Sequence, residues 1–221
     1  MYDAVIFDND GVLVSRTPYD ALHEAAWAAF DAAGVSNPDR SAVESTVVNA
    51  TPTTVRQICE RHDVDPQTFW AHRERLSTER QQTEARAGRK TPYEDLRALD
   101  RLSVPLGIVS SNQQATVDFL VEYFGLESYF EVALGRGPTL RSLDRQKPDP
   151  YYLNRAIDAL EAESVLFVGD NDSDIQAADN AGVDSVFIRR PHRRQHDPTP
   201  EPTYVVEDLH DIVGLCRSTI A

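Results

Sequence analysis

The stretch 5–13 constrains the fold of this chain more than any other, because an apolar run leads directly into two carboxylates. Residues 5–7 are apolar and mostly β-branched, which predicts a short buried strand. Asp8 and Asp10 follow at the spacing that puts side chains on the same side of a strand, and Gly11 permits a tight turn. Two carboxylates at the end of a buried strand lose hydration and repel each other. Proteins accept that cost chiefly where a cation or a reaction requires it.

Taken alone, this stretch fits a surface turn equally well, because Asn9-Asp10-Gly11 is a common turn sequence. The pattern of the remaining chain favours the first interpretation. Further buried strands are predicted at 106–110, 129–134, 164–169, 185–188 and 203–206, and helices at 91–102, 113–124, 151–160 and 175–181, with a closing helix through Leu215. Strands that alternate with helices predict a parallel sheet covered on both faces. Ligands bind such sheets at the carboxyl ends of the strands.

Two segments depart from this alternation. Residues 19–86 contain no clear strand and read as helical, with prolines near helix starts at Pro52 and Pro66, and they predict a helical insertion after the first strand. The sequence Thr91-Pro92-Tyr93-Glu94 then predicts a capping box at the start of the next helix. The Arg-rich segment 189–194 is interpreted as solvated loop charges.

Charge and cysteine content limit the possible partners. The chain has 22 basic and 36 acidic residues, a net charge of −14, which argues against nucleic acid or an anionic membrane as the main partner. The basic residues are nearly all arginine, with lysine only at 90 and 147, and such an acidic, lysine-poor surface fits a salt-rich, halophilic cytoplasm. Cys59 and Cys216 are far apart in the sequence, so a disulfide framework is not expected. The early first strand leaves no room for a signal peptide, and we expect a cytoplasmic protein.

Three later segments supply polar residues near predicted strand ends. Ser110, Ser111 and Asn112 offer hydroxyls and backbone N–H groups suited to phosphate, although Ser and Asn are also common helix N-caps. Lys147 precedes a rigid Pro-Asp-Pro sequence, and by itself it equally fits a solvated loop lysine.

The third segment ends the strand 164–169 in a glycine followed by the carboxylates of Asp170, Asp172 and Asp174. Magnesium binds a few carboxylate oxygens and retains several waters. Helix capping explains one or two of these acids, but it does not easily explain Asp170 at a strand end.

In this order and spacing, the segments around Asp8, Ser110, Lys147 and Asp170 resemble the motifs of the haloacid dehalogenase superfamily. The likeness is to its phosphatase branch with a helical C1-type cap, the group of phosphoglycolate phosphatases and β-phosphoglucomutases, and it extends from Val5 to about Ile188. It implies a doubly wound, Rossmann-like parallel sheet as the core, residues 1–16 and 89–221. Residues 17–88 would form the α-helical cap.

The resemblance also implies roles for the motif residues in a small-phosphomonoester hydrolase. Asp8 would be the nucleophile that forms an aspartyl-phosphate, and Asp10 the general acid and base. Mg²⁺ would be held at Asp8, at Asp10 through its backbone carbonyl, and at Asp170, while Asp174 would orient the metal site. The list of residues expected around the phosphoryl group is Ser110, Ser111, Asn112 and Lys147.

Three other functions compete with this one. A phosphomutase would use the same motifs and return the phosphoryl group to a sugar phosphate. A dehalogenase needs no metal and no acid at position 10, so Asp10 and Asp170 argue against it. A catalytically silent binding module would retain the fold, and the intact set of motif residues argues against it without excluding it.

Overall fold

The computed structural model describes residues 2–48 and 50–218, and its centre is a six-stranded parallel sheet in the order β3-β2-β1-β4-β5-β6. The strands are β1 (Ala4–Phe7), β2 (Leu106–Gln113), β3 (Val132–Arg136), β4 (Val165–Gly169), β5 (Asp184–Ile188) and β6 (Tyr204–Val206). The chain order reverses at β1, which pairs with β2 on one side and β4 on the other. The predicted doubly wound α/β fold is confirmed.

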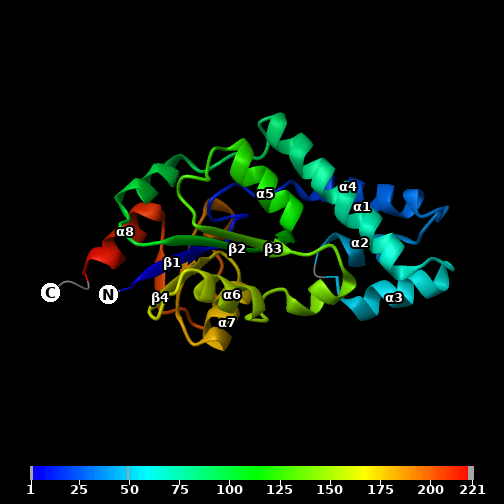
Figure 1. Cartoon of the computed structure of the whole chain (residues 1–221). Coiled ribbons are helices and arrows are strands. Elements are labelled where there is room, and N and C mark those ends of the chain that lie inside the picture. Colours follow the sequence, from blue (N-terminus) through cyan, green and yellow to red (C-terminus); the bar gives the residue numbers. More distant parts are fainter. Residues whose placement is uncertain (1, 49, 219–221) are drawn as a thin grey trace.

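Helices cover both faces of the sheet (Figure 1). Those of the sheet-containing part are α5 (Gln114–Tyr123), α6 (Tyr151–Ala159), α7 (Asp172–Ala181) and α8 (Leu209–Ser218), with 3₁₀ helices η1 (Glu94–Arg101), η2 (Leu140–Arg145) and η3 (Pro191–Arg193). Side chains of β1 alternate between two apolar clusters: Val5 and Phe7 pack with α5 and α8, and Ala4 and Ile6 with α6. This period of two follows from the pleat of the strand.

The helical insertion lies beyond the carboxyl end of the sheet (Figure 1). It consists of α1 (Tyr19–Ala32), α2 (Arg40–Val47), α3 (Pro52–Arg61) and α4 (Pro66–Arg86). These helices share an apolar cluster of their own around Phe30, Phe69 and Trp70, to which η2 adds Leu140 and Leu143.

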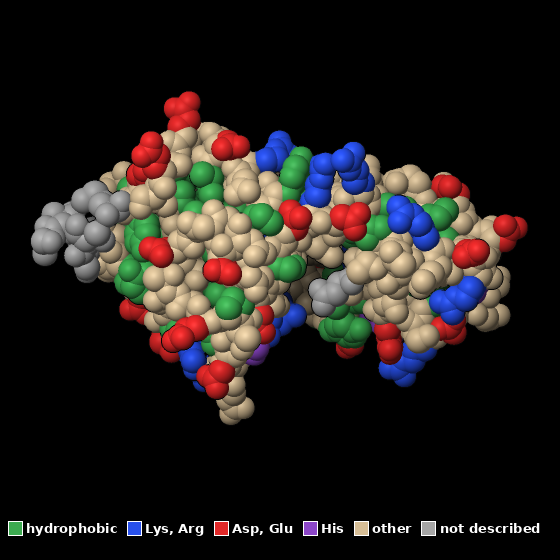
Figure 2. All heavy atoms as spheres, turned by 90° about the horizontal axis from the view of Figure 1, so that it is seen from below, with side chains coloured by type: hydrophobic (Ala, Val, Ile, Leu, Met, Phe, Trp, Pro, Cys, Tyr) green, Lys and Arg blue, Asp and Glu red, His purple; other side chains and the backbone are tan. Residues whose placement is uncertain are grey.

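The space-filling view shows a hollow between the two parts, and acidic side chains spread over the visible face (Figure 2). None of the helices in the described residues is both long and apolar enough to cross a membrane.

Two local predictions were wrong. The predicted capping box at 91–94 does not form, because Ser15 and Thr91 are hydrogen-bonded and Pro92 bridges Val14, so that the segment is extended and a 3₁₀ helix starts at Glu94. Strand β2 also runs beyond Ser110 to Gln113 with an irregular register. The strand predicted for 106–110 therefore ended too early, and Ser111 and Asn112 lie within it.

Candidate active site

The carboxyl ends of β1, β2 and β4 converge on one pocket of about 250 Å³ between the sheet and the helical insertion. Phe7 pairs with Ile108 and with Val168, so the residues that follow these positions come out side by side. All eight site residues predicted from the sequence line this pocket: Asp8, Asp10, Ser110, Ser111, Asn112, Lys147, Asp170 and Asp174. Parallel strands that end together explain how positions more than 100 residues apart meet.

Lys147 joins two of the buried carboxylates. Its Nζ lies 2.6 Å from Asp8 Oδ1 and 2.6 Å from Asp174 Oδ1, and it also donates to the carbonyl of Val109 at 3.2 Å. Asp8 Oδ2 has no hydrogen-bond partner among the described residues. The ammonium therefore fixes one oxygen of Asp8 and leaves the other open toward the pocket.

Burial and mutual repulsion determine the protonation of this cluster. Burial raises the pKa of Asp8 to about 8, against the opposing attraction of Lys147, and the charges of Asp174 and Asp170 add to the rise. Burial likewise raises the pKa of Asp174. Burial disfavours the ammonium of Lys147, yet Asp174 and Asp8 outweigh that effect and raise its pKa. Three buried carboxylates lie close together here and Lys147 pairs with two of them, so the cluster favours additional positive charge.

Asp174 has both of its oxygens occupied. Oδ1 binds Lys147, and Oδ2 accepts the backbone N–H groups of Asp170 at 3.1 Å and Asn171 at 3.0 Å, as part of a capping box that begins α7. A Cβ at Gly169 would lie 2.2 Å from the Cβ of Asp174, so this close approach requires glycine. These contacts fit a residue that orients the loop of Asp170.

Asp170 is held from two directions. Gly11, at φ +92°, passes so close that a Cβ there would lie 2.5 Å from Asp170 Oδ2. The same oxygen lies 2.5 Å from His192 Nε2 and 3.6 Å from Arg193 Nε. Asp170 Oδ1 has no such contact among the described residues, so one oxygen is anchored and one is available.

The donor set fits a hard divalent cation. Asp8, Asp170 and Asp174 each offer one carboxylate oxygen, and these atoms lie within 4.8 Å of one another. Magnesium is bound by a small number of such oxygens together with water. Because Asp174 is occupied by other partners, Asp8 and Asp170 are the better candidates for direct ligands.

Asp10 has a different environment. The ammonium of Lys90 contacts Asp10 Oδ1, and Asn112 Nδ2 donates to Asp10 Oδ2 at 3.1 Å. Asn112 also exchanges hydrogen bonds of 2.8 and 2.9 Å with Gln81 of α4. Both oxygens of Asp10 therefore accept hydrogen bonds, and part of this support comes from the helical insertion.

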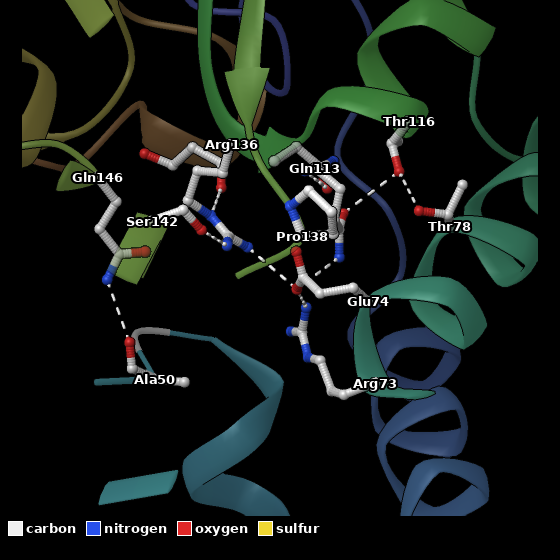
Figure 3. Close-up of polar contacts among 12 residues, drawn as sticks. Ala50, Arg73, Glu74, Thr78, Gln113, Thr116, Arg136, Pro138, Ser142 and Gln146 are labelled. Atoms are coloured by element: carbon white, nitrogen blue, oxygen red, sulfur yellow. Dashed lines mark hydrogen bonds and ion pairs between the residues drawn. The ribbon is translucent and has the colours of Figure 1, made fainter. Parts of the chain in front are cut away.

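A buried ion-pair network joins the insertion to the sheet near the pocket (Figure 3). Glu74 Oε1 of α4 lies 3.0 Å from Arg73 and 3.3 Å from Arg136 at the end of β3. Arg136 Nε donates to the carbonyl of Ser111 at 2.6 Å, while Arg73 donates to the carbonyls of Thr46 and Val47. The Arg73–Glu74–Arg136 cluster thus connects α2 and α4 with the segment expected to bind phosphate.

The interpretation of residues 189–194 as solvated charges holds for the exposed Arg194 and for Arg189, which pairs with exposed Asp197 at 3.5 Å, but it was wrong for Arg190 and Arg193. Arg190 is buried, donates twice to the carbonyl of Val12, pairs with Asp95 at 2.7 Å and stacks on Tyr93. Arg193 lines the pocket beside Asp170. In a loop that follows a strand, the sequence does not distinguish an arginine that pairs inside the protein from one that is solvated.

Lys90 was not predicted as a site residue, although a signal existed. The chain has only two lysines among 22 basic residues, and both contact an aspartate of the first motif. Glu74 and Arg136 carry no comparable signal, because they lie in segments rich in similar residues.

Comparison with known proteins agrees with this geometry. The sequence profile of haloacid dehalogenase-like hydrolases matches residues 5–188. The chain belongs to this family. It is therefore a hydrolase with the fold of the family, and the predicted resemblance is confirmed.

Named relatives of the chain are phosphatases. It is 27% identical to the phosphoglycolate phosphatase of Rhodobacter capsulatus over 198 residues, which cover 88% of this chain and 87% of the relative. It is 30% identical to the pyrophosphatase PpaX of Anoxybacillus flavithermus over 133 residues, which cover 59% of this chain and 60% of that protein. The second match thus spans less than two thirds of the relative.

Solved structures share the fold. CbbY from Rhodobacter sphaeroides in complex with phosphate superposes with a TM-score of 0.70 at 18% identity and covers 96% of both chains. At this identity the likeness concerns the fold, including a helical block beside a parallel sheet.

Proposed function

We propose that this family member is a Mg²⁺-dependent phosphatase that hydrolyses a small phosphomonoester through an aspartyl-phosphate on Asp8. The observation that carries the proposal is the pairing of Asp8 Oδ1 with Lys147 at 2.6 Å while Oδ2 stays open to the pocket. A carboxylate held by one oxygen presents the other to an incoming phosphorus atom. Orientation of this kind contributes much of the acceleration in enzymatic group transfer.

The proposed reaction has two displacement steps. An oxygen of Asp8 forms a bond to phosphorus, the bond to the leaving oxygen breaks, and Asp10 supplies the proton to that oxygen. In the second step Asp10 takes a proton from water, the water oxygen bonds to phosphorus, and the bond to Asp8 breaks. Inorganic phosphate is released and Asp8 returns to a carboxylate.

The remaining site residues would stabilise the phosphoryl group. Lys147 and the Ser110 hydroxyl lie in the pocket beside Asp8, and we assign to them, with Ser111 and Asn112, the equatorial oxygens. Phosphoryl transfer depends largely on such positioning and charge neutralisation.

Asp8, Asp170 and the backbone carbonyl of Asp10 would hold Mg²⁺, with Asp174 orienting the loop. The cation, when bound, neutralises charge on the carboxylates and the phosphoryl oxygens. The raised pKa values of Asp8 and Asp174 support this assignment, because burial and neighbouring carboxylates disfavour the charged forms that a cation would stabilise.

We further propose that residues 17–88 act as a cap that selects the substrate. Their separate apolar cluster supports this division, and Val47, Ala50 and Trp70 line the pocket opposite the sheet. The names of the relatives, and a structure of CbbY with xylulose-(1,5)-bisphosphate, support a small phosphorylated metabolite as substrate. The net charge of −14 supports a salt-rich cytoplasm as the working environment.

The test is phosphate release from a panel of phosphorylated metabolites with Mg²⁺ or with EDTA, in a series of KCl concentrations. We expect release that requires Mg²⁺ and increases with KCl. Isomerised sugar phosphate in place of free phosphate would instead identify a phosphomutase. Binding of metabolites without turnover of any of them would identify a silent binding module.

A further inference from the structure

Lys90 is a fully buried cation in the segment that leads from α4 back to the sheet. Its side chain has no exposed surface, and its ammonium contacts Asp10 Oδ1, the carbonyl of Ser15 at 3.0 Å and the hydroxyl of Thr17 at 3.2 Å. A buried charge is strongly unfavourable unless it is paired and hydrogen-bonded. Lys90 is thus built into the structure around Asp10.

The use of lysine at this position is selective. The chain contains 20 arginines (22 basic residues less two lysines), and the lysines contact the two aspartates of the first motif, Lys147 at Asp8 and Lys90 at Asp10. Lysine supplies a compact point charge, whereas arginine supplies a wide planar fork. A chain whose other basic residues are arginines therefore has a compact cation at each aspartate of the first motif.

Both oxygens of the Asp10 side chain are held by hydrogen-bond donors. Lys90 donates to Oδ1 and the Asn112 amide donates to Oδ2 at 3.1 Å, and both partners only donate at these contacts. Each carboxylate oxygen has a second lone pair, so Asp10 held in this way can still accept a proton from water.

Lys90 also connects Asp10 to both segments that join the helical insertion to the sheet. Ser15 and Thr17 belong to the outgoing segment, and Lys90 belongs to the returning one. Thr17 in turn donates to Gln81 of α4 at 3.0 Å, the same residue that holds Asn112. The position of the Asp10 carboxylate is therefore set at the junction of the two parts.

We propose that Lys90 is a positioning residue that holds Asp10 as the base for hydrolysis of the phosphorylated Asp8. This inference rests on the proposed function. In the step concerned, water loses a proton to Asp10, its oxygen bonds to phosphorus, and the bond from phosphorus to Asp8 breaks. Loss of Lys90 slows this step more than the first step, when the leaving group departs without a proton.

The test uses p-nitrophenyl phosphate with rapid mixing, because nitrophenolate is a leaving group that needs no proton. In full-length Lys90→Met, which removes the charge and nearly keeps the volume, we expect a burst approaching one nitrophenolate per active site. The steady-state rate after the burst should be roughly 10- to 100-fold lower than that of the wild type, because the variant loses part of the acceleration that proton transfer supplies. Acid quenching should recover the protein phosphorylated on Asp8.

Arg89→Met is the matched control. Arg89 is the neighbouring cation in the same segment, but it is 55% exposed and pairs at 2.6 Å with Glu84, which keeps Arg80 as a second partner. It should keep the wild-type burst and steady state. Lys90→Arg, which retains the charge, should show a smaller burst than Lys90→Met, and Lys90→Gln serves as the second test if the methionine variant does not fold.

The outcomes separate this inference from the proposed function. A wild type that forms neither phosphorylated protein nor phosphate contradicts the proposed function itself. A second outcome is a wild type that forms both, while the Lys90 variants slow nitrophenolate and phosphate release equally and show no larger burst. That result overturns the proposed role of Lys90 and leaves the proposed function intact. A merely structural role predicts that second pattern.

Discussion

The two aspartates of the first motif lie two residues apart and have different surroundings. Asp8 contacts Lys147 and lies near Asp170 and Asp174, all of which belong to the sheet-containing part. Asp10 contacts Lys90 of the returning segment and Asn112, which is itself bound by Gln81 of the helical insertion. The nucleophile and metal half of the proposed site thus depends on the sheet, whereas the acid–base half depends on the junction with the insertion.

Solvent contact differs in the same direction. The side chain of Asp8 is 9% exposed and that of Asp10 is 24% exposed. A nucleophile is protected by exclusion of water, while a residue that activates water must be accessible to it. The difference between Asp8 and Asp10 indicates that one short motif can serve two chemical roles, because two structural parts supply the partners of its residues.

The largest expected effect is that of Asp8→Asn, which removes the nucleophile. Turnover should be abolished, since an amide cannot form the proposed intermediate, while the fold is retained. Phosphate release and circular dichroism of the variant are the measurements. Activity close to that of the wild type would mean that Asp8 is not the nucleophile and that the two aspartates do not divide the roles in this way.

The same variant has a predictable effect on stability in the absence of metal. The pKa of Asp8 is raised from 3.8 to about 8, so between these values the folded state binds more protons than the unfolded state. Wild-type stability therefore falls as pH rises through this window, and Asp8→Asn removes that loss. Urea unfolding should show a larger gain for the variant at pH 8 than at pH 4.

Asp10→Asn should reduce turnover by about 10²- to 10⁴-fold, the range that proton transfer contributes. Mg²⁺ affinity should change little, because the proposed ligand is the backbone carbonyl, whereas Asp170→Asn should lose the metal. Isothermal titration with Mg²⁺ compares the two variants. Equal losses of affinity would mean that the Asp10 side chain is itself a ligand and that the two halves are not distinct.

Replacing residues 17–88 with a short linker tests the dependence of each half on the insertion. We expect a soluble core that still hydrolyses p-nitrophenyl phosphate, because the Asp8 cluster and the two apolar clusters of the sheet lie almost entirely outside this segment. Discrimination among natural substrates should fall. Failure of the core to fold would mean that it depends on contacts with the insertion, such as those of Leu140 and Leu143, and that the division into two domains is wrong.

The smallest effect on turnover is expected for Glu74→Gln, which removes the negative charge between Arg73 and Arg136. Two buried guanidinium groups then lack a carboxylate, and the free energy of unfolding should fall by about 3 kcal/mol with little change in kcat. Glu79→Gln on the same helix is the control, since its pair with Arg75 is 54% exposed and should contribute less than about 0.5 kcal/mol. Equal stability changes in the two variants would mean that the buried network contributes no more to stability than an exposed pair does.

Much of the fold and of the proposed site could be predicted from the sequence because both depend on local patterns. Apolar runs identified the strands, and the chain order of strands and helices required a parallel sheet. The carboxyl ends of the strands then had to share an edge, which brought Asp8, Ser110 and Asp170 into one pocket. The tight turn at Gly11 was predicted in the same way, but the structure alone shows that Gly11 and Gly169 let the backbone approach Asp170 and Asp174 closely.

The partners of Asp10 and the buried charges were decided only by the tertiary structure. Lys90, Glu74 and Arg190 stand in charged, loop-like or helical sequence, where a solvated side chain and a buried one look alike, and each acquired its role from a residue at least 60 positions away. The box expected at Thr91 failed for the same reason, because pairing with the segment at Val14 and Ser15 outweighed a local helix signal. Local sequence determines which elements form, but the free energy of burying a charge depends on the partner that the completed fold brings to it.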